Sequence, residues 1–508
     1  MVYFYESMNI LKKIAPLRYF LGTCLIYCLL YFPFLDQIPS IAMDEGWNAF
    51  TSASFFGLLP HPEFEISKTV FSQYNLFFLY YACIFPFLKL FGISLFSIRL
   101  FSTLCGILGL FGLYKINRLL NWPRYAELLV YLLYITSNIS LVLFHWGRPE
   151  GMVTTAYIFF IYFFLKGYIT DSKKAWFLTG SFSMIMLITH PFSGLILFPM
   201  GAFMLNKIIK KQLTPFTYFM LGVLPFFLLI TINLFIINVH NIQNTVFNIL
   251  DRTSVATNKG FFERAFAFLN HYTLGIKRLY IFLFEIGILI YGVIRKKHSK
   301  PAKLLSFFGL SAWVIGLYLF SPFRRRYFCI IAITSIIVLG ELLAKRPFRK
   351  IQDNLWLWGL TGIFFLNTLA GDLYYGYKHI RNTSYKTIMK KLRALPIPKS
   401  ASIVVPVQFW MPFHDYYAIS NVHDFPIKQF DSIQEMLNAG VIDYVLVSPY
   451  LLENKSPTTG QTTSFYPTGN PYLIALMNYS KTAAELAFTI DAPPYGTLEI
   501  YKSKKKTP

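Results

Sequence analysis

The sequence predicts an α-helical polytopic membrane protein with a small α/β domain at its C-terminal end. The 508 residues are 55% hydrophobic and only 14% charged, against roughly 25% charged residues in an ordinary soluble domain. The apolar residues come in repeated runs of about twenty, the length that a helix needs to cross a hydrocarbon core of about 30 Å. After Tyr375, charged residues and prolines return and no further long apolar run follows.

The apolar runs predict about 11 to 13 transmembrane helices. The stretch 74–91 contains Asn75, Pro86 and Lys89, so we expect it to lie along or dip into the outer face of the membrane. The alternative is that the basic cluster at Lys115 is external. The runs lie near residues 17–35, 74–91, 95–114, 126–144, 151–168, 175–190, 192–206, 214–238, 276–294, 303–321, 327–344 and 354–375.

The formal net charge of +23 would suggest nucleic acid in a soluble protein. Here the basic residues cluster between the apolar runs, and the positive-inside rule assigns such clusters to the cytoplasm. The charge therefore indicates the lipid bilayer and not nucleic acid as a partner. We expect a multi-pass protein of the plasma membrane with a cytoplasmic N-terminus. The clusters are Lys12/Lys13/Arg18, Lys115/Arg118/Arg124, Lys173/Lys174, Lys207/Lys210/Lys211, Arg295 to Lys303 and Lys345 to Lys350.

Two domains are expected. Residues 1–375 form the transmembrane domain, with an outer loop at 36–73, and residues 376–508 form a periplasmic or extracellular α/β domain. An amphipathic helix at 384–395 is expected to lie on an anionic membrane surface. Within the second domain, alternating apolar residues predict strands at 402–406, 442–448, 487–490 and 497–501, with a helix at 432–439.

Adjacent acids stand close to the outer end of the first span. Asp44 and Glu45 lie between Met43 and Trp47. An acid at a membrane surface is costly and usually marks a site or pairs with a cation. A carboxylate kept from full hydration there can act as a general base, so both acids are candidate catalytic residues. The alternative is a pair of solvated loop carboxylates.

The turn from His145 to Gly151 is the second candidate. It carries His145, Arg148 and Glu150, and the alternation of spans puts it on the same side as Asp44. Arg148 is a candidate for binding a phosphate or orienting Glu150, and Glu150 for orienting an acceptor or assisting Asp44. The alternative is helix-end chemistry, since Pro149 and Glu150 suit the first turn of a helix.

Three consecutive arginines precede Tyr327 on the side that the alternation assigns to the outside, namely Arg324, Arg325 and Arg326. A guanidinium binds phosphate through a planar fork of donors, so these residues are candidates for binding a lipid-linked phosphate. Attraction to anionic headgroups is the alternative.

The sequence has no Gly-rich phosphate loop, HExxH or CxxC, so no cytosolic nucleotide donor is indicated. No metal or other cofactor is required, although a divalent cation between Asp44 and Glu150 is left open.

The segments Asp44-Glu45-Gly46-Trp47-Asn48, Gln73 to Gly92, Arg99-Leu100 and Arg148-Pro149-Glu150 together resemble the GT-C glycosyltransferases of the protein mannosyltransferase and aminoarabinose transferase superfamily. The resemblance covers roughly residues 15 to 170 and extends to Arg326-Tyr327. It implies a GT-C fold, a polyprenyl-phosphate-sugar donor, and transfer on the periplasmic or lumenal side.

The resemblance also implies residue roles. Asp44 matches the acid of the first outer loop, and Glu150 matches a later acid that is Asp in many members. Gln73-Tyr74 stands where aminoarabinose transferases have Lys-Pro. Phosphate binding therefore falls to other basic residues, which are Lys68, Arg148, Arg324, Arg325 and Arg326. Trp47, His145 and Tyr327 are expected near the acceptor or sugar.

These inferences lead to one functional hypothesis. The chain is expected to be an inverting hexosyl- or pentosyltransferase that uses a polyprenyl-phosphate sugar, with Asp44 as the base or acceptor-orienting acid. The acceptor, whether lipid, glycan or protein, is not specified by the sequence. The rival is a transporter, flippase or polymerase of lipid-linked glycans. A transporter tends to carry ionisable groups at the bilayer midplane and paired repeats, whereas here the acids concentrate in outer loops.

Overall fold

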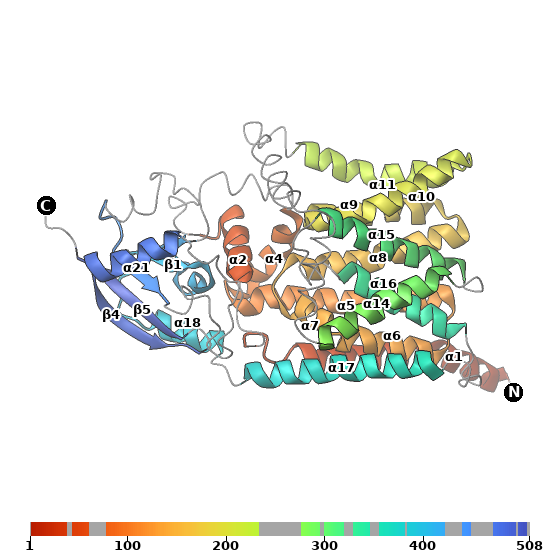
Figure 1. The fold of residues 1–508 in the computed structure, drawn as a ribbon, viewed down its shortest axis with the longest axis horizontal. Coiled ribbons are helices and arrows are strands. Elements are labelled where there is room, and N and C mark those ends of the chain that lie inside the picture. Colours follow the sequence, from red (N-terminus) through yellow and green to blue (C-terminus); the bar gives the residue numbers. More distant parts are fainter. Residues whose placement is uncertain are drawn as a thin grey trace.

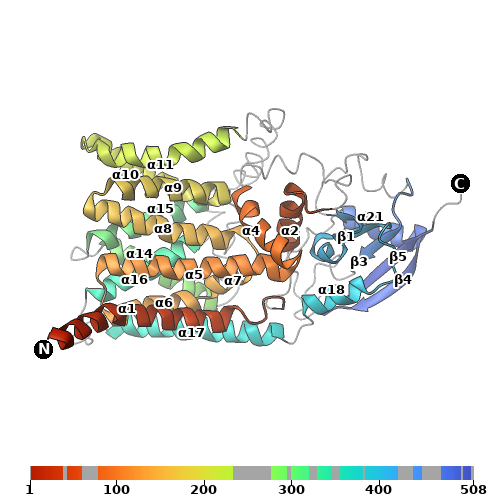
Figure 2. The same cartoon turned by 180° about the vertical axis from the view of Figure 1, so that it is seen from behind.

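The computed structural model describes the chain as a long helical bundle with a smaller sheet domain at one end (Figure 1). The N-terminus lies at the end of the bundle opposite the sheet domain (Figures 1 and 2). The described residues are 2–37, 43–59, 78–232, 276–294, 299–319, 329–345, 355–380, 384–421, 439–448, 471–493 and 496–504.

Most helices of the bundle overlap the expected apolar runs, whereas α2 lies within the segment 36–73 that was expected as an outer loop. Their bounds are α1 Val2–Tyr31, α2 Met43–Phe55, α4 Phe78–Phe91, α5 Leu95–Leu120, α6 Arg124–Thr136, α7 Asn138–His145, α8 Pro149–Thr170, α9 Lys173–Thr189, the 3-10 helix η3 Pro191–Ile196, α10 Leu197–Ile209, α11 Leu213–Ile232, α14 Ile276–Ile294, α15 Lys300–Leu319, α16 Cys329–Ala344 and α17 Leu355–Ile380. The predicted domain division at residues 375/376 lies inside α17.

Four helices in the described part of the chain are long and apolar enough to cross a membrane, or five if α6 and α7 count as one bent span. The four are Leu95–Leu120, Pro149–Thr170, Phe192–Ile209 and Leu213–Ile232. Shorter apolar helices accompany them, among them Leu17–Tyr31 and Cys329–Ala344. A multi-helix membrane architecture is therefore confirmed, and the total of about 11 to 13 spans stays a prediction.

The span expected at 126–144 consists of two helices. The helices α6 and α7 meet at a bend of 60°. Ser137 between them has extended backbone, and its hydroxyl accepts a hydrogen bond from the Ser140 N–H. A serine that caps a helix in this way starts a new helix instead of continuing the old one.

The stretch expected at the outer face forms α4, which lies with α2 at the end of the bundle nearest the sheet domain (Figures 1 and 2). The Ser52 hydroxyl on α2 donates to the Tyr81 carbonyl on α4 at 2.9 Å. The two short helices therefore cover the end of the bundle as one unit.

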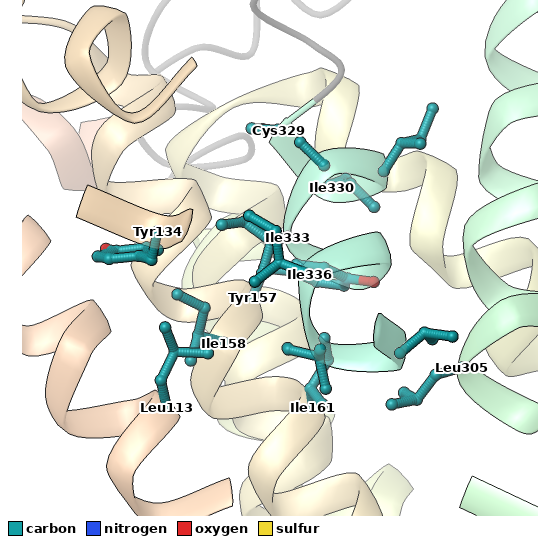
Figure 3. Close-up of a cluster of buried hydrophobic side chains, with 14 of the residues drawn as sticks. Leu113, Tyr134, Tyr157, Ile158, Ile161, Leu305, Cys329, Ile330, Ile333 and Ile336 are labelled. Atoms are coloured by element: carbon teal, nitrogen blue, oxygen red, sulfur yellow. The ribbon is translucent and has the colours of Figure 1, made fainter. Parts of the chain in front are cut away.

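Apolar packing holds the bundle together. Figure 3 shows Tyr157 and Ile161 of α8 against Ile333 and Ile336 of α16. The Tyr157 hydroxyl is satisfied by the Thr334 hydroxyl at 2.6 Å, as a buried polar group in such a core requires.

The sheet domain follows α17. It contains α18 Tyr385–Arg393, the 3-10 turns η7 Val407–Phe409 and η8 Met411–Phe413, and α21 Pro471–Ala483. Its strands are β1 Ser402–Pro406, β2 Tyr417–Asn421, β3 Tyr444–Val447, β4 Ala484–Asp491 and β5 Thr497–Ser503.

The strands form one mixed sheet in the order β2-β1-β3-β5-β4. β1 runs parallel to β2 and β3, with Ile403 opposite Tyr444, and β5 runs antiparallel to β3 and β4. All residues of β1 and β3 are buried, as is usual for the central strands of a covered sheet. The four predicted strands are present as β1, β3, β4 and β5, while β2 and α21 are additions. Most of the helix expected at 432–439 lies outside the described residues.

The helix α18 differs from its prediction. Its apolar side chains, Tyr385, Ile388, Met389 and Leu392, are buried in the core that includes β1 and β3. The apolar face therefore packs on the sheet domain, and it is not available to lie on a membrane.

Candidate functional site

Asp44 lies in the first turn of α2 at the end of the bundle that faces the sheet domain. Acids in the first turn interact favourably with the exposed N–H groups and dipole of a helix, which favours the start of α2 here. The Asp44 side chain is 36% exposed, and its Oδ2 forms an ion pair with Nη1 of Arg148. Asp44 is thus both held in place and open to solvent on one side.

Arg148 joins Asp44 to a second acid, Glu150. Arg148 directly precedes α8, Pro149 is the first helical residue, and Glu150 lies in the first turn. The Nε and Nη2 nitrogens of Arg148 donate to the two Glu150 oxygens at 3.2 and 3.1 Å. The guanidinium also lies 5.6 Å from the Trp146 ring centroid, close enough for a cation–π contact. One buried guanidinium therefore holds two carboxylates.

Glu45, the neighbour of Asp44, has a different environment. Its side chain is 0% exposed and is paired with Arg99 of α5, which is also 0% exposed. The carboxylate therefore faces the interior of the bundle, although the sequence placed it with the catalytic acids. Arg99 was not among the predicted site residues. Its position within the apolar run 95–114 was a signal, because a cation inside such a run normally has a partner.

Trp47 and His145, expected near the sugar or acceptor, are both buried. Trp47 lies one helical turn after Asp44 and packs against Phe50, with ring centroids 6.2 Å apart. His145 ends α7, and its ring lies 5.3 Å from the Tyr31 ring. Both residues belong to the packing around the acids, and their contact with a substrate stays a prediction.

The remaining candidates for phosphate binding lie outside the residues that the structure describes. They are Lys68, Arg324, Arg325 and Arg326, and Tyr327 lies outside as well. The structure therefore brings Arg148 to the acids, and the roles predicted for Arg324, Arg325 and Arg326 stay predictions.

No cluster of three or more His, Cys, Asp or Glu side chains suited to a metal ion occurs within the described ranges. The place between Asp44 and Glu150 is taken by the guanidinium of Arg148. A divalent cation there would have to displace this side chain.

The sheet domain packs directly on the helix that carries Asp44. Phe50 of α2 and Trp410 of the sheet domain form an edge-to-face pair with centroids 5.0 Å apart, and both belong to one buried core. The backbone N–H of Tyr385 donates to the Asp36 carbonyl at 3.1 Å. Burial raises the pKa of the Tyr385 hydroxyl well above its ordinary value, and the negative charge of Glu45 raises it further. The two domains therefore meet beside the acids.

The chain is similar to one protein family and to several solved structures. The family model described as dolichyl-phosphate-mannose-protein mannosyltransferase matches residues 78–235. No curated protein gives a significant match to the whole sequence.

Three solved structures are similar over nearly the whole chain. ArnT from Cupriavidus metallidurans bound to undecaprenyl phosphate has a TM-score of 0.63 at 10% identity, covering 96% of this chain and 98% of that one. The oligosaccharyltransferase AglB from Archaeoglobus fulgidus, in complex with an inhibitory peptide and a dolichol-phosphate, has a TM-score of 0.53 at 11% identity, covering 98% and 75%. The arabinofuranosyltransferase AftD from Mycobacteria has a TM-score of 0.54 at 13% identity, covering 96% of this chain and 40% of that one.

Proposed function

We propose that this chain is a membrane glycosyltransferase of the GT-C superfamily. It transfers a sugar from a polyprenyl-phosphate donor to an acceptor on the extracytoplasmic face, with inversion at the anomeric carbon. The resemblance seen in the sequence is confirmed at the level of fold, since ArnT, AglB and AftD share the architecture. The donor, the stereochemistry and the residue roles are the proposal.

One observation carries the proposal for this chain. Asp44 is a partly exposed carboxylate held by a buried arginine at the end of a membrane bundle. A base must reach its substrate, and it must also be fixed in orientation. Among the three acids of the site, Asp44 alone combines a 36% exposed side chain with such an ion pair, since Glu45 and Glu150 are 0% and 1% exposed.

The proposed reaction is a single displacement. Asp44 accepts the proton of the acceptor hydroxyl or amine as that atom bonds to the anomeric carbon. The bond from this carbon to the phosphate oxygen breaks, and its electron pair leaves with the polyprenyl phosphate. Glu150 acts through Arg148 by fixing the guanidinium that orients Asp44.

The leaving phosphate gains negative charge in the transition state, and fixed cations stabilise such charge. Both ArnT and AglB have been solved with a polyprenyl phosphate, which supports this class of donor. The acceptor is proposed only as a nucleophile presented on the outer face, whether lipid, glycan or protein. The cations proposed to bind the phosphate are Lys68, Arg324, Arg325 and Arg326, together with Arg148.

The experiment compares a deletion strain of the source organism with its parent. Lipid-linked sugars and surface glycans are measured by mass spectrometry. The proposal predicts that one polyprenyl-phosphate sugar accumulates and that the same sugar disappears from a surface glycan. Reintroducing the wild-type gene reverses both changes, whereas a gene encoding Asp44→Asn does not. Unchanged lipids and glycans in the deletion strain would refute the proposal.

A further inference from the structure

Glu45 uses its whole carboxylate for contacts inside the protein. Arg99 donates from Nε to Oε1 and from Nη2 to Oε2, both at 2.7 Å. The backbone N–H of Gly147 donates to Oε1 as well, at 2.8 Å. Charge-assisted, two-point pairs of this kind are strong and directional.

Arg99 of α5 also binds the backbone that follows α1. Its third nitrogen, Nη1, donates to the Leu35 carbonyl at 2.9 Å, just after α1 ends. The guanidinium therefore connects α5 both to α2 and to the segment that leaves α1. Because the pair is fully buried, removal of one partner leaves an uncompensated charge in the interior.

Gly147 is held at both of its backbone polar groups by α2. Its N–H donates to Glu45, and its carbonyl accepts a hydrogen bond from Nδ2 of Asn48 at 2.9 Å. A side chain at this position is also excluded, since a Cβ at residue 147 would lie 2.9 Å from Cβ of Ile98. The turn between α7 and α8 is thus fixed against α2 and α5.

Glu45 and Gly147, which are hydrogen-bonded to each other, each have a sequence neighbour in the candidate site. The neighbour of Glu45 is Asp44, and the neighbour of Gly147 is Arg148. Asp44 and Arg148 form the ion pair across the site. Small displacements of fixed catalytic groups are costly, since a shift of about 1 Å can lower a rate about 100-fold. Fixing Glu45 to Gly147 therefore fixes the separation of Asp44 and Arg148.

From this geometry we propose that Glu45 and Arg99 are a positioning pair that sets the distance between Asp44 and Arg148, and that Glu45 takes no part in proton transfer. The inference rests on the proposed function for its kinetic consequence. Its structural consequence can be measured without any turnover, so a failure of one does not imply a failure of the other.

The kinetic test uses purified enzyme in nanodiscs and the slow hydrolysis of radiolabelled undecaprenyl-phosphate sugars as the probe, because this reaction needs no identified acceptor. Glu45→Gln and Arg99→Gln each leave one buried charge without its partner and should lower kcat about 100-fold. The double variant Glu45→Gln/Arg99→Gln removes both charges and keeps an oxygen for the Gly147 N–H. It should recover at least tenfold over either single variant, with the pH profile of the wild type.

Two further variants separate charge from position. Glu45→Met/Arg99→Met is also neutral but offers Gly147 no acceptor, so it should fold and remain as slow as the single variants. Glu127→Gln removes the charge of a buried acid that pairs with Arg118. This pair lies at the other end of α5, about 28 Å from Arg99 along the helix, and kcat should stay within about twofold of the wild type. A Glu45→Gln/Arg99→Gln variant no faster than the single variants would overturn the proposal.

The structural test applies even to a chain that hydrolyses none of the probes. Asp44→Cys/Arg148→Cys is treated with dibromobimane, and the crosslinked peptide is quantified by mass spectrometry. The two site charges are absent here, so the distance between the thiols depends on the contacts that hold Glu45, Asn48 and Gly147. Crosslinking should slow at least tenfold when Arg99→Gln is added and recover when Glu45→Gln is added to that. Crosslinking that is indifferent to Arg99→Gln would contradict the positioning role.

Discussion

Asp44 and Arg148 form an ion pair between the first turn of α2 and the residue that precedes α8. The two residues are far apart in the sequence. Glu45 follows Asp44 and Gly147 precedes Arg148, and a buried hydrogen bond joins Glu45 to Gly147. The ion pair is therefore supported by buried hydrogen bonds of the neighbouring residues. In the proposed reaction this arrangement presents a carboxylate oxygen of Asp44 to the acceptor.

Replacing Arg148 by lysine should impair turnover although the charge is kept. A lysine ammonium is a point charge and cannot reproduce the planar fork that holds both Asp44 and Glu150. We expect kcat for donor hydrolysis to fall by about 100-fold. Arg118→Lys is the matched control, because Arg118 also pairs with a buried glutamate, Glu127, but at the far end of α5. Equal kcat values for the two variants would contradict the role given to Arg148.

Glu150 is expected to act through Arg148 and not on the substrate. Glu150→Gln keeps one oxygen to accept from Arg148 but loses a charge-assisted bond, which is worth about 1.5 to 3 kcal/mol. The variant should lose about tenfold in kcat with little change in KM, and Glu150→Asp should be less impaired because the charge remains. A Glu150→Gln enzyme with wild-type kcat would show that this acid is dispensable.

The close packing of α9 on α11 should depend on Gly222. A Cβ at this position would run into the carbonyl oxygen of Phe177 on α9, and small residues are what allow membrane helices to approach so closely. Gly222→Ala should therefore lower stability by about 1 to 3 kcal/mol, measured as a lower Tm in detergent. Gly201→Ala is the control, since nothing lies within 4 Å of its Cβ position. Equal Tm values for both variants would argue against this packing.

The sheet domain should stabilise α2 through Trp410. Trp410→Ala removes a buried aromatic side chain that packs on Phe50, and such truncations cost about 3 to 5 kcal/mol. Hydrogen exchange of residues 43–55 should accelerate, and donor hydrolysis should fall with it. Trp356→Ala on α17, where the residue is 48% exposed, should change neither. Unchanged exchange in α2 after Trp410→Ala would mean that the two domains are not coupled.

Much of the fold could be predicted from the sequence because membrane helices are recognised by their length and hydropathy. The bend at Ser137 could not, since it depends on a local hydroxyl cap inside an apolar run. The strand β2 was also missed. Its five residues alternate poorly and lie at the edge of the sheet, where pairing with β1 defines the strand.

The candidate site, like the fold, could be predicted from the sequence only in part. Asp44, Arg148 and Glu150 could be selected because acids are few in this chain and these charges stand next to the ends of apolar runs, and the structure brings all three together. The different role of Glu45 could not be read from its position beside Asp44. In a helix, adjacent side chains point in different directions, and only the tertiary packing places Arg99 opposite Glu45 and not opposite Asp44.

The most direct test of the central claim is the turnover of undecaprenyl-phosphate sugars by the wild type and by Asp44→Asn in the same nanodiscs. Asparagine keeps the size of the side chain and an oxygen to accept from Arg148, but it cannot take a proton. We expect an unchanged Tm, unchanged binding of undecaprenyl phosphate and a loss of turnover of about 100-fold to 10,000-fold, the range that a general base supplies. Turnover of Asp44→Asn at the wild-type rate would contradict the role of Asp44 as the base.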